Sequence, residues 1–270
     1  HQYDNLPQQA AGYDIAGQPL FTPIGGLGGV SAAVRAHAPQ DAQNIAAASL
    51  ATPLPLGIMQ PDVPNARWNI YPSSAIQGAF LAGVGLPLIA RATGFASDAA
   101  VWQAVRTHPG DVVIDDAALS GPDAAALGIQ NPPPLPAIGQ FLGPPIAAGL
   151  PGLSSLESLN GGSAATQAQT GALPELSTLA ANPSLLPEFT LRLSAVVAGP
   201  GRIAPTTLWA SDLRGGPAVR LTVVGVVQNV RGERYGLLGS PATFANAERG
   251  LAPFASEYYY FTVKPGVDVH

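Results

Sequence analysis

The sequence predicts an α+β fold, in which mixed β-sheets are combined with short helices. Two segments carry this expectation. Between Val219 and Asn229 apolar and polar residues alternate at first, and from Val223 both faces are apolar, as in a strand whose end is covered on both sides. Between Ser97 and Gly110 the sequence has an N-cap serine, an acid in the first turn and a closing Pro-Gly pair, which together indicate a short helix.

The segment 219–229 is expected to be a central strand. Five of its eleven residues are valines, whose branched side chains fit a pleated surface better than a helix. Turns that contain glycine and charged residues bound the segment on both sides, at 214–217 and 231–234. The other elements are therefore expected to be arranged around this strand.

The first third of the chain is predicted to contain two extended segments between two helices. A short helix is expected at residues 30–37. The glycine-rich run before it, at 25–29, departs from the G-x-G-x-x-G phosphate-binding pattern and is expected to be a flexible turn. Residues 44–59 and 67–76 are predicted to be extended, with a proline-rich turn between them. A helix is expected to follow at residues 79–91.

The helix predicted at residues 97–107 has charges that suit its dipole. Asp98 lies in the first turn, where the dipole is positive, and basic residues lie near the negative end. Trp102 shares a face with two valines and is expected to be buried in the core. A short apolar strand at residues 111–114 follows and leads to the pair Asp115-Asp116.

The last third of the chain is predicted to contain further strands and one helix. Strands are expected at residues 189–197 and 206–210, before the central strand. A short helix is expected at residues 240–250, because Pro241 suits the first turn of a helix. An aromatic strand at residues 258–263 is expected to end the fold.

The chain is expected to form two lobes. A mixed α/β lobe is predicted from residues 1–112 together with 241–270, and a β-rich lobe from residues 113–240. The second lobe contains a Pro/Ala/Gly-rich insertion at 122–187, in which residues 124–187 carry only two charges. Such low charge argues against a self-repelling tail, so the insertion is expected to lie against the fold.

Composition excludes several classes of protein. The chain has no cysteine, which excludes a disulfide scaffold, a thiolate metal site and cysteine catalysis. The histidines His1, His37, His108 and His270 form no H-x-x-x-H pair, so no metal site is expected. Only 11% of the residues are charged, no basic run exists, and no nucleic-acid partner is expected. The start of the sequence lacks an initiator Met and a signal peptide, so a piece of a longer protein is expected.

No catalytic, cofactor-binding or metal-binding residue is predicted, and partner-binding residues are not assigned. Asp115 and Asp116 are expected to form a turn cap or a solvated loop, because neighbours on a strand point to opposite faces. Ser240 follows a glycine but lacks the G-x-S-x-G pattern, and it is expected to be an N-cap. The run 258–260, three tyrosines, is expected to pack on both faces of a strand.

Three pieces of the sequence resemble, in their order and spacing, a known family. They are Trp68-Asn69-Ile70-Tyr71 continuing to Pro87-Leu88, then Ser97 to Asp115, then Leu221 to Val227, which is followed by Gly239-Ser240-Pro241 and the aromatic strand to Gly266. Together they resemble the extracytoplasmic domain of FtsX-like, MacB-type ABC transporter permeases, over roughly residues 66–118 and 188–266. The insertion has no counterpart in this resemblance.

The resemblance implies a non-enzymatic domain inserted between the first and second transmembrane helices of a permease subunit. The lobe with both chain ends would then lie near the membrane, outside the cytoplasm, with both ends on the same side. The implied partners are a cytoplasmic ABC ATPase, a second permease subunit, and a lipid, lipoprotein, peptide or partner protein. Separately, the low charge and the leucine stripes of the insertion suggest a contact surface for a lipid or partner, and deletion of residues 124–186 is then expected to spare folding but abolish transport.

Two other functions remain open from the sequence. A secreted carbohydrate- or peptide-binding module would use residues 258–260 and Trp209, and it predicts a concave aromatic cleft. An α/β hydrolase-like enzyme would need a Ser or Asp within hydrogen-bond reach of His37 or His108 in a pocket.

Overall fold

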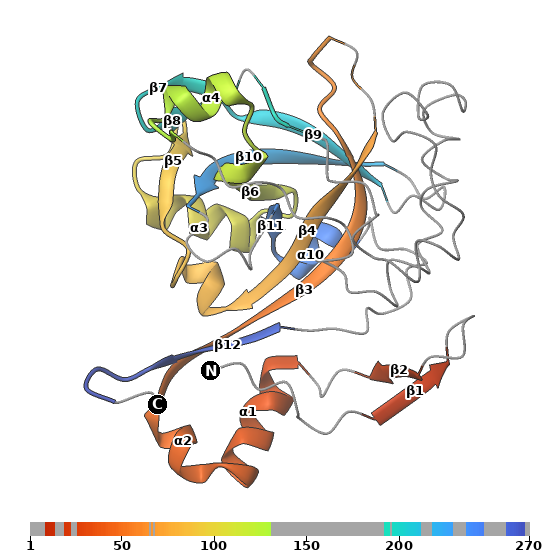
Figure 1. Cartoon of the computed structure of the whole chain (residues 1–270), viewed down its shortest axis with the longest axis vertical. Coiled ribbons are helices and arrows are strands. Elements are labelled where there is room, and N and C mark those ends of the chain that lie inside the picture. The colour runs from red at the N-terminus through yellow and green to blue at the C-terminus, as the bar shows by residue number, and fades with distance from the viewer. Residues whose placement is uncertain are drawn as a thin grey trace.

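A mixed sheet of ten strands with short helices confirms the α+β class (Figure 1). The computed structural model describes residues 9–13, 19–22, 26–64, 66, 68–130, 192–194, 196–211, 218–228, 236–245 and 258–267. The strands are β1 (Gln9–Tyr13), β2 (Pro19–Thr22), β3 (Ile45–Met59), β4 (Asn69–Gly78), β5 (Leu88–Ala92), β6 (Asp111–Asp115), β7 (Val197–Gly199), β8 (Arg202–Ile203), β9 (Thr206–Ser211), β10 (Val219–Val227), β11 (Leu237–Gly239) and β12 (Tyr258–Val263). The helices are α1 (Gly26–His37), α2 (Pro39–Asn44), α3 (Asp98–Thr107), α4 (Gly121–Ala126) and α10 (Pro241–Phe244), with 3-10 turns η1 (Ala79–Ala82) and η2 (Asp116–Ala118).

Six of the ten strands close into a barrel. Going round the ring, β3 pairs with β4, β4 with β11, β11 with β6, β6 with β10 and β10 with β9. Strand β9 then pairs with the end of β3 and completes the ring. Outside the ring, β12 pairs with the first half of β3, and β5 pairs with the second half of β10. The separate pair β1–β2 lies outside this sheet.

The central position predicted for residues 219–229 is confirmed by β10, which pairs with three strands. Arg220 is exposed, whereas all five residues from Val223 to Val227 are buried, as the change of pattern predicted. Gly225 is part of this buried end. A Cβ atom there would lie 2.9 Å from Cδ2 of Leu88 and 3.2 Å from Cγ1 of Val101 in α3. The missing side chain therefore allows α3 to pack directly on the sheet.

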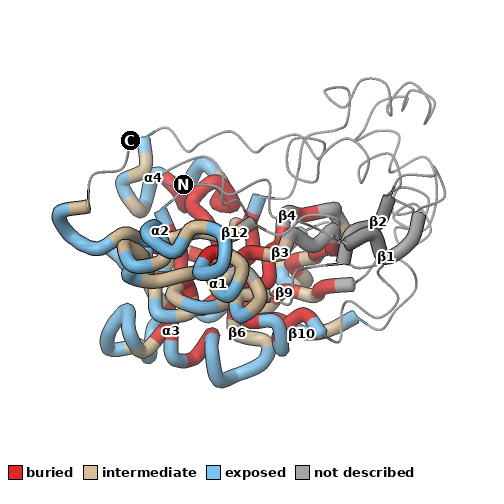
Figure 2. The backbone as a smooth tube through the Cα atoms, turned by 90° about the horizontal axis from the view of Figure 1, so that it is seen from below, coloured by how far each residue is buried: buried red, intermediate tan, exposed pale blue. Residues whose placement is uncertain are grey.

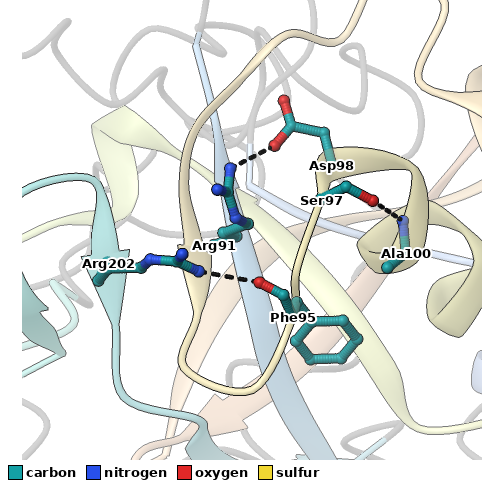
Figure 3. Close-up of polar contacts among 6 residues, drawn as sticks. All are labelled: Arg91, Phe95, Ser97, Asp98, Ala100 and Arg202. Carbon is teal, nitrogen blue, oxygen red and sulfur yellow. Dashed lines mark hydrogen bonds and ion pairs between the residues drawn. The ribbon is translucent and has the colours of Figure 1, made fainter.

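The predicted helix at residues 97–107 is α3, and its cap is confirmed. The Ser97 hydroxyl accepts a hydrogen bond from the Ala100 N–H at 3.2 Å. Two arginines hold the loop before the helix, and they are paired residues of the neighbouring strands β5 and β8 (Figure 3). Arg91 forms an ion pair with Asp98 at 2.9 Å, and Arg202 donates to the carbonyl of Phe95 at 2.9 Å. These contacts fix the helix at the edge of the barrel.

The prediction of a helix at residues 79–91 is wrong. This segment contains the short turn η1, then a loop with Gly83 and Gly85 at positive φ, then strand β5. The two glycines and Pro87 end the turn before a second helical turn can form. Residues 88–92 are extended instead because they pair with the buried end of β10. Tertiary pairing thus decides a segment whose local pattern resembled a helix.

The other expected elements agree with the structure in most places. Residues 44–59, 67–76, 111–114, 206–210 and 258–263 correspond to strands β3, β4, β6, β9 and β12. The turn expected at 25–29 is wrong from residue 26 onward, because α1 begins at Gly26. Helix α10 confirms the start of the helix expected at 240–250, and residues 246–250 lie outside the described part. In the strand expected at 189–197, Leu193 forms an isolated bridge and β7 begins only at Val197.

The division into two lobes stays a prediction. Its boundary at residues 112–113 falls inside β6, and described strands from both expected lobes hydrogen-bond in one sheet. The expected insertion begins inside α4, where Asp123 is 6% and Ala124 is 1% exposed. A deletion that starts at residue 124 would therefore remove part of the core. Residues 131–191, which make up most of the expected insertion, lie outside the described part.

Substitution of Gly83 by alanine tests how tightly Trp102 is packed in the core. Gly83 and Gly128 both have φ of 79°, so alanine strains the backbone equally at both positions. A Cβ atom at Gly83 would fall on the indole ring of Trp102, whereas at Gly128 nothing lies within 4 Å. We expect Gly128→Ala to cost about 1–2 kcal/mol. Gly83→Ala is expected to cost about 1–3 kcal/mol more. Urea unfolding of the two variants measures this difference, and equal losses would show that the indole does not limit the site.

Candidate functional site

Polar contacts that join distant parts of the chain concentrate at one end of the barrel. Strands β3 and β6 point in the same direction along the barrel, so their C-terminal ends lie at the same end of it. Gln60 follows β3, and residues 116–123 follow β6. Residues 192–194, 196 and 197, which we call the strap, bind to both. The strap therefore ties together two strands that are not neighbours in the barrel.

Gln60 holds the strap through both atoms of its side-chain amide. Its Nε2 donates to the carbonyl of Ser194 at 2.8 Å, and its Oε1 accepts from the Ser194 N–H at 3.1 Å. The Gln60 side chain thus makes the two hydrogen bonds that a neighbouring strand would make. Gln60 is only 4% exposed, so both bonds are shielded from water.

The backbone beyond β6 binds the strap on its other side. The Leu193 N–H donates to the carbonyl of Ala118 at 2.8 Å, and the Ser120 N–H donates to the carbonyl of Leu193 at 2.7 Å. The guanidinium of Arg192 donates to the carbonyl of Ala117. The side chain of Leu193 is fully buried. The side chain of Leu193 therefore anchors the strap in the core.

Asp123 is the charged centre of these contacts. Its Oδ1 accepts from the N–H groups of Val196 at 3.1 Å and Val197 at 3.0 Å. Its Oδ2 accepts from the hydroxyl of Ser120 at 2.6 Å, and the same hydroxyl caps α4. A carboxylate that is 6% exposed is stable only when its oxygens are hydrogen-bonded. The three donors meet this requirement, and the charge in turn fixes the strap to α4.

Tyr71 and Asp115 lie buried on strands of the barrel, and Arg192 of the strap is close enough for its charge to act on Tyr71. Burial raises the pKa of Tyr71 well above its usual value, the charge of Asp115 raises it further, and Arg192 lowers it. The phenol therefore stays protonated at neutral pH. Oδ1 of Asp115 accepts from the Ala118 N–H at 3.1 Å and caps η2, which confirms the expected turn cap. The alternative of a solvated loop is wrong, because Asp115 is 0% and Asp116 is 6% exposed.

The histidines considered for a hydrolase lie elsewhere, at the C-terminal ends of two helices. His37 is the last residue of α1 and is exposed. Nδ1 of His108, just beyond α3, lies 3.5 Å from Oδ2 of Asp111, and the His108 side chain is 71% exposed. Burial raises the pKa of Asp111, and His108 partly offsets the effect. This His–Asp pair is therefore a surface contact at the end of a helix.

The aromatic residues considered for a ligand platform are divided between two places. The ring of Tyr260 packs on Phe80 with centroids 5.0 Å apart, which confirms the expected packing for this residue. On β3, Tyr260 is opposite Ser49 and Trp209 is opposite Met59. These positions are ten residues apart, about 33 Å along a strand. Trp209 and Tyr260 therefore do not form one aromatic cleft.

Within the described ranges, no group of three or more His, Asp or Glu residues is placed to hold a metal ion. Among the helices of these same ranges, none combines the length and the apolar character needed to cross a bilayer.

Sequence reasoning missed the residues that hold the strap. One signal was present: Ser120-Gly121-Pro122-Asp123 has the serine, the N-terminal proline and the acid of a capping box. It predicts the bond between Ser120 and Asp123, but not the bonds from Asp123 to the strap. Nothing near Gln60 predicts its partner, because Ser194 is 134 residues away in the sequence.

Substitution of Asp123 measures how strongly the strap is held. Asp123→Ala leaves the buried Val196 N–H and the partly buried Val197 N–H without this acceptor, and we expect it to destabilise the protein by about 2–4 kcal/mol. Asp123→Asn keeps one oxygen for these groups and is expected to cost about half as much. Asp98→Ala, at an aspartate side chain that is 52% exposed, is the control and is expected to cost less than about 1 kcal/mol. Urea unfolding gives all three values, and an Asp123→Ala loss no larger than that of Asp98→Ala would contradict this account.

Comparison with known proteins does not place the chain in a family: no protein-family model, no curated protein and no solved structure matches it significantly.

Proposed function

We propose that this chain is a non-enzymatic extracytoplasmic domain of an ABC transporter permease subunit of the FtsX-like, MacB-type kind. In this role the domain transmits ATP-driven movement of membrane helices to a lipid, lipoprotein, peptide or partner protein outside the cytoplasm. Its partners would be a cytoplasmic ATPase and a second permease subunit. The proposal rests on the resemblance in sequence together with the way the chain enters and leaves the sheet.

The chain enters and leaves the sheet at the same place, and this observation carries the proposal. Strand β3 begins at Ile45, and Ile45 pairs with Val263, the last residue of β12. One residue further out, the Lys264 N–H donates to the carbonyl of Asn44 at 2.8 Å. Figure 1 shows β12 running alongside the lower part of β3. A domain inserted between two neighbouring membrane helices needs its two ends close together, and this adjacent entry into and exit from the sheet supports such an arrangement.

Helices pack against the sheet near the paired ends of β3 and β12, and this packing supports the proposal. Helix α1 packs on β3, and its Val34 is 2% exposed. Figure 2, seen from below, shows α1 and α2 mostly exposed or intermediate, with buried residues behind them in the strands. The paired ends of β3 and β12 are thus supported by a packed helix. Movement of these paired ends would therefore be passed to the sheet.

The location of the domain can be tested in cells with the whole reading frame that contains this chain. Val84 is 39% exposed and the chain has no cysteine, so Val84→Cys gives one accessible thiol here. We expect a membrane-impermeant maleimide to label this variant in intact cells, with the unsubstituted protein as the control. The reading frame is also expected to encode an apolar stretch of about 20 residues on each side of the domain. Labelling only after lysis, or flanks without such stretches, would refute the proposal.

A further inference from the structure

Strand β3 connects the place where the chain enters and leaves the sheet with the strap. It has 15 residues, and at about 3.3 Å per residue it extends over about 50 Å. Its first residue, Ile45, pairs with the end of β12. Immediately after its last residue, Gln60 makes the two hydrogen bonds to Ser194 in the strap. One strand therefore has a bonded contact at each end.

The pairing of β3 with β4 is continuous. Ten successive residue pairs, from Ser49–Gly78 to Ile58–Asn69, follow one another without a shift in register. The pairings of β10 with β5 and with β6 each contain a shift. An uninterrupted ladder resists sliding because every hydrogen bond would have to change partner together. The β3–β4 pair is thus suited to move as one stiff body.

The far end of β3 has a specific connection to the strap. Leu193 and Val196 in the strap are both fully buried, so the strap cannot shift without its neighbours. The side chain of Gln60 is the part of the β3 end that bonds to it. A shift of β3 along its axis would therefore change the geometry of these two bonds and, through the strap, that of the bonds that Asp123 makes to it.

We propose that β3 is a mechanical link between the two connections of the domain and the strap, and that Gln60 is the positioning residue that passes the movement on. The link joins the end of the sheet at which the chain enters and leaves to the strap, which begins directly after residues 131–191. The proposal depends on the proposed function only for the source of the movement. The coupling itself is a property of the described residues and can be measured on the isolated chain.

A disulfide at the first contact provides the perturbation. Ile45→Cys with Val263→Cys places two cysteines on directly paired residues of a chain that has none of its own. The oxidised and reduced forms of this one variant are compared by amide hydrogen exchange. The reporters are the N–H groups of Val196 and Val197, which Asp123 binds. We expect their exchange to slow by roughly two- to thirtyfold on oxidation. No change at these two amides would refute the link.

The role of Gln60 is tested in the same background. Gln60→Met keeps the volume of the side chain and removes both hydrogen bonds, and we expect it to abolish the effect of oxidation at Val196 and Val197. Gln77→Met, at a half-buried glutamine on β4, is the matched control and is expected to leave the effect intact. A full effect in Gln60→Met would show that the coupling bypasses Gln60. If that variant does not fold, Gln60→Glu keeps the acceptor for the Ser194 N–H and is expected to retain part of the effect, whereas complete retention or complete loss would contradict the assigned role.

These outcomes are distinguishable from failure of the proposed function. Exchange rates in the isolated chain do not depend on membrane helices or on an ATPase. The cell-labelling test can therefore fail while the link from Ile45 to Val197 is confirmed, and the reverse is equally possible.

Discussion

The pairing of β9 with both β10 and β3 is the constraint on which the rest of the structure depends. Without this double pairing the sheet would be open, and the ends of β3 and β6 would lie several strands apart on a twisted surface. Closure into a ring brings these ends together at one mouth of the barrel. Only there can a segment of a few residues reach both Gln60 and the backbone beyond β6.

The strap shows how a segment joins a core without a regular ladder. Its backbone groups are bound by a side-chain amide, by two loop backbone groups and by a carboxylate. Buried peptide groups need partners, and side chains supply them where no strand is available. The cost is a charge inside the protein, at Asp123, which needs three donors of its own. This arrangement makes the strap specific for one position on the barrel.

Strand β3 is the element on which the proposed function depends most. One end of this strand lies where the chain enters and leaves the sheet, and the other end lies at the strap. A protein that transmits movement needs stiff elements between its points of attachment, and a continuous ladder is stiff because its hydrogen bonds act together. Prolines at positions 53 and 55 fit this strand, because residues 52–56 have no second neighbour among the described strands. Their missing N–H groups leave no bond unmade on that side.

The sequence by itself determined the elements whose signals are local: the valine-rich strand β10, the capped helix α3 and the strands with clear alternation. It also determined that Trp102 would be buried, because helix periodicity places it with apolar neighbours. Only the tertiary structure decided that residues 88–92 would be a strand, that the sheet would close, and that Gln60 and Asp123 would both bind the strap. The physical reason is that these choices depend on hydrogen-bond partners far away in the sequence, and no local pattern of residues records which distant backbone groups a side chain will bind.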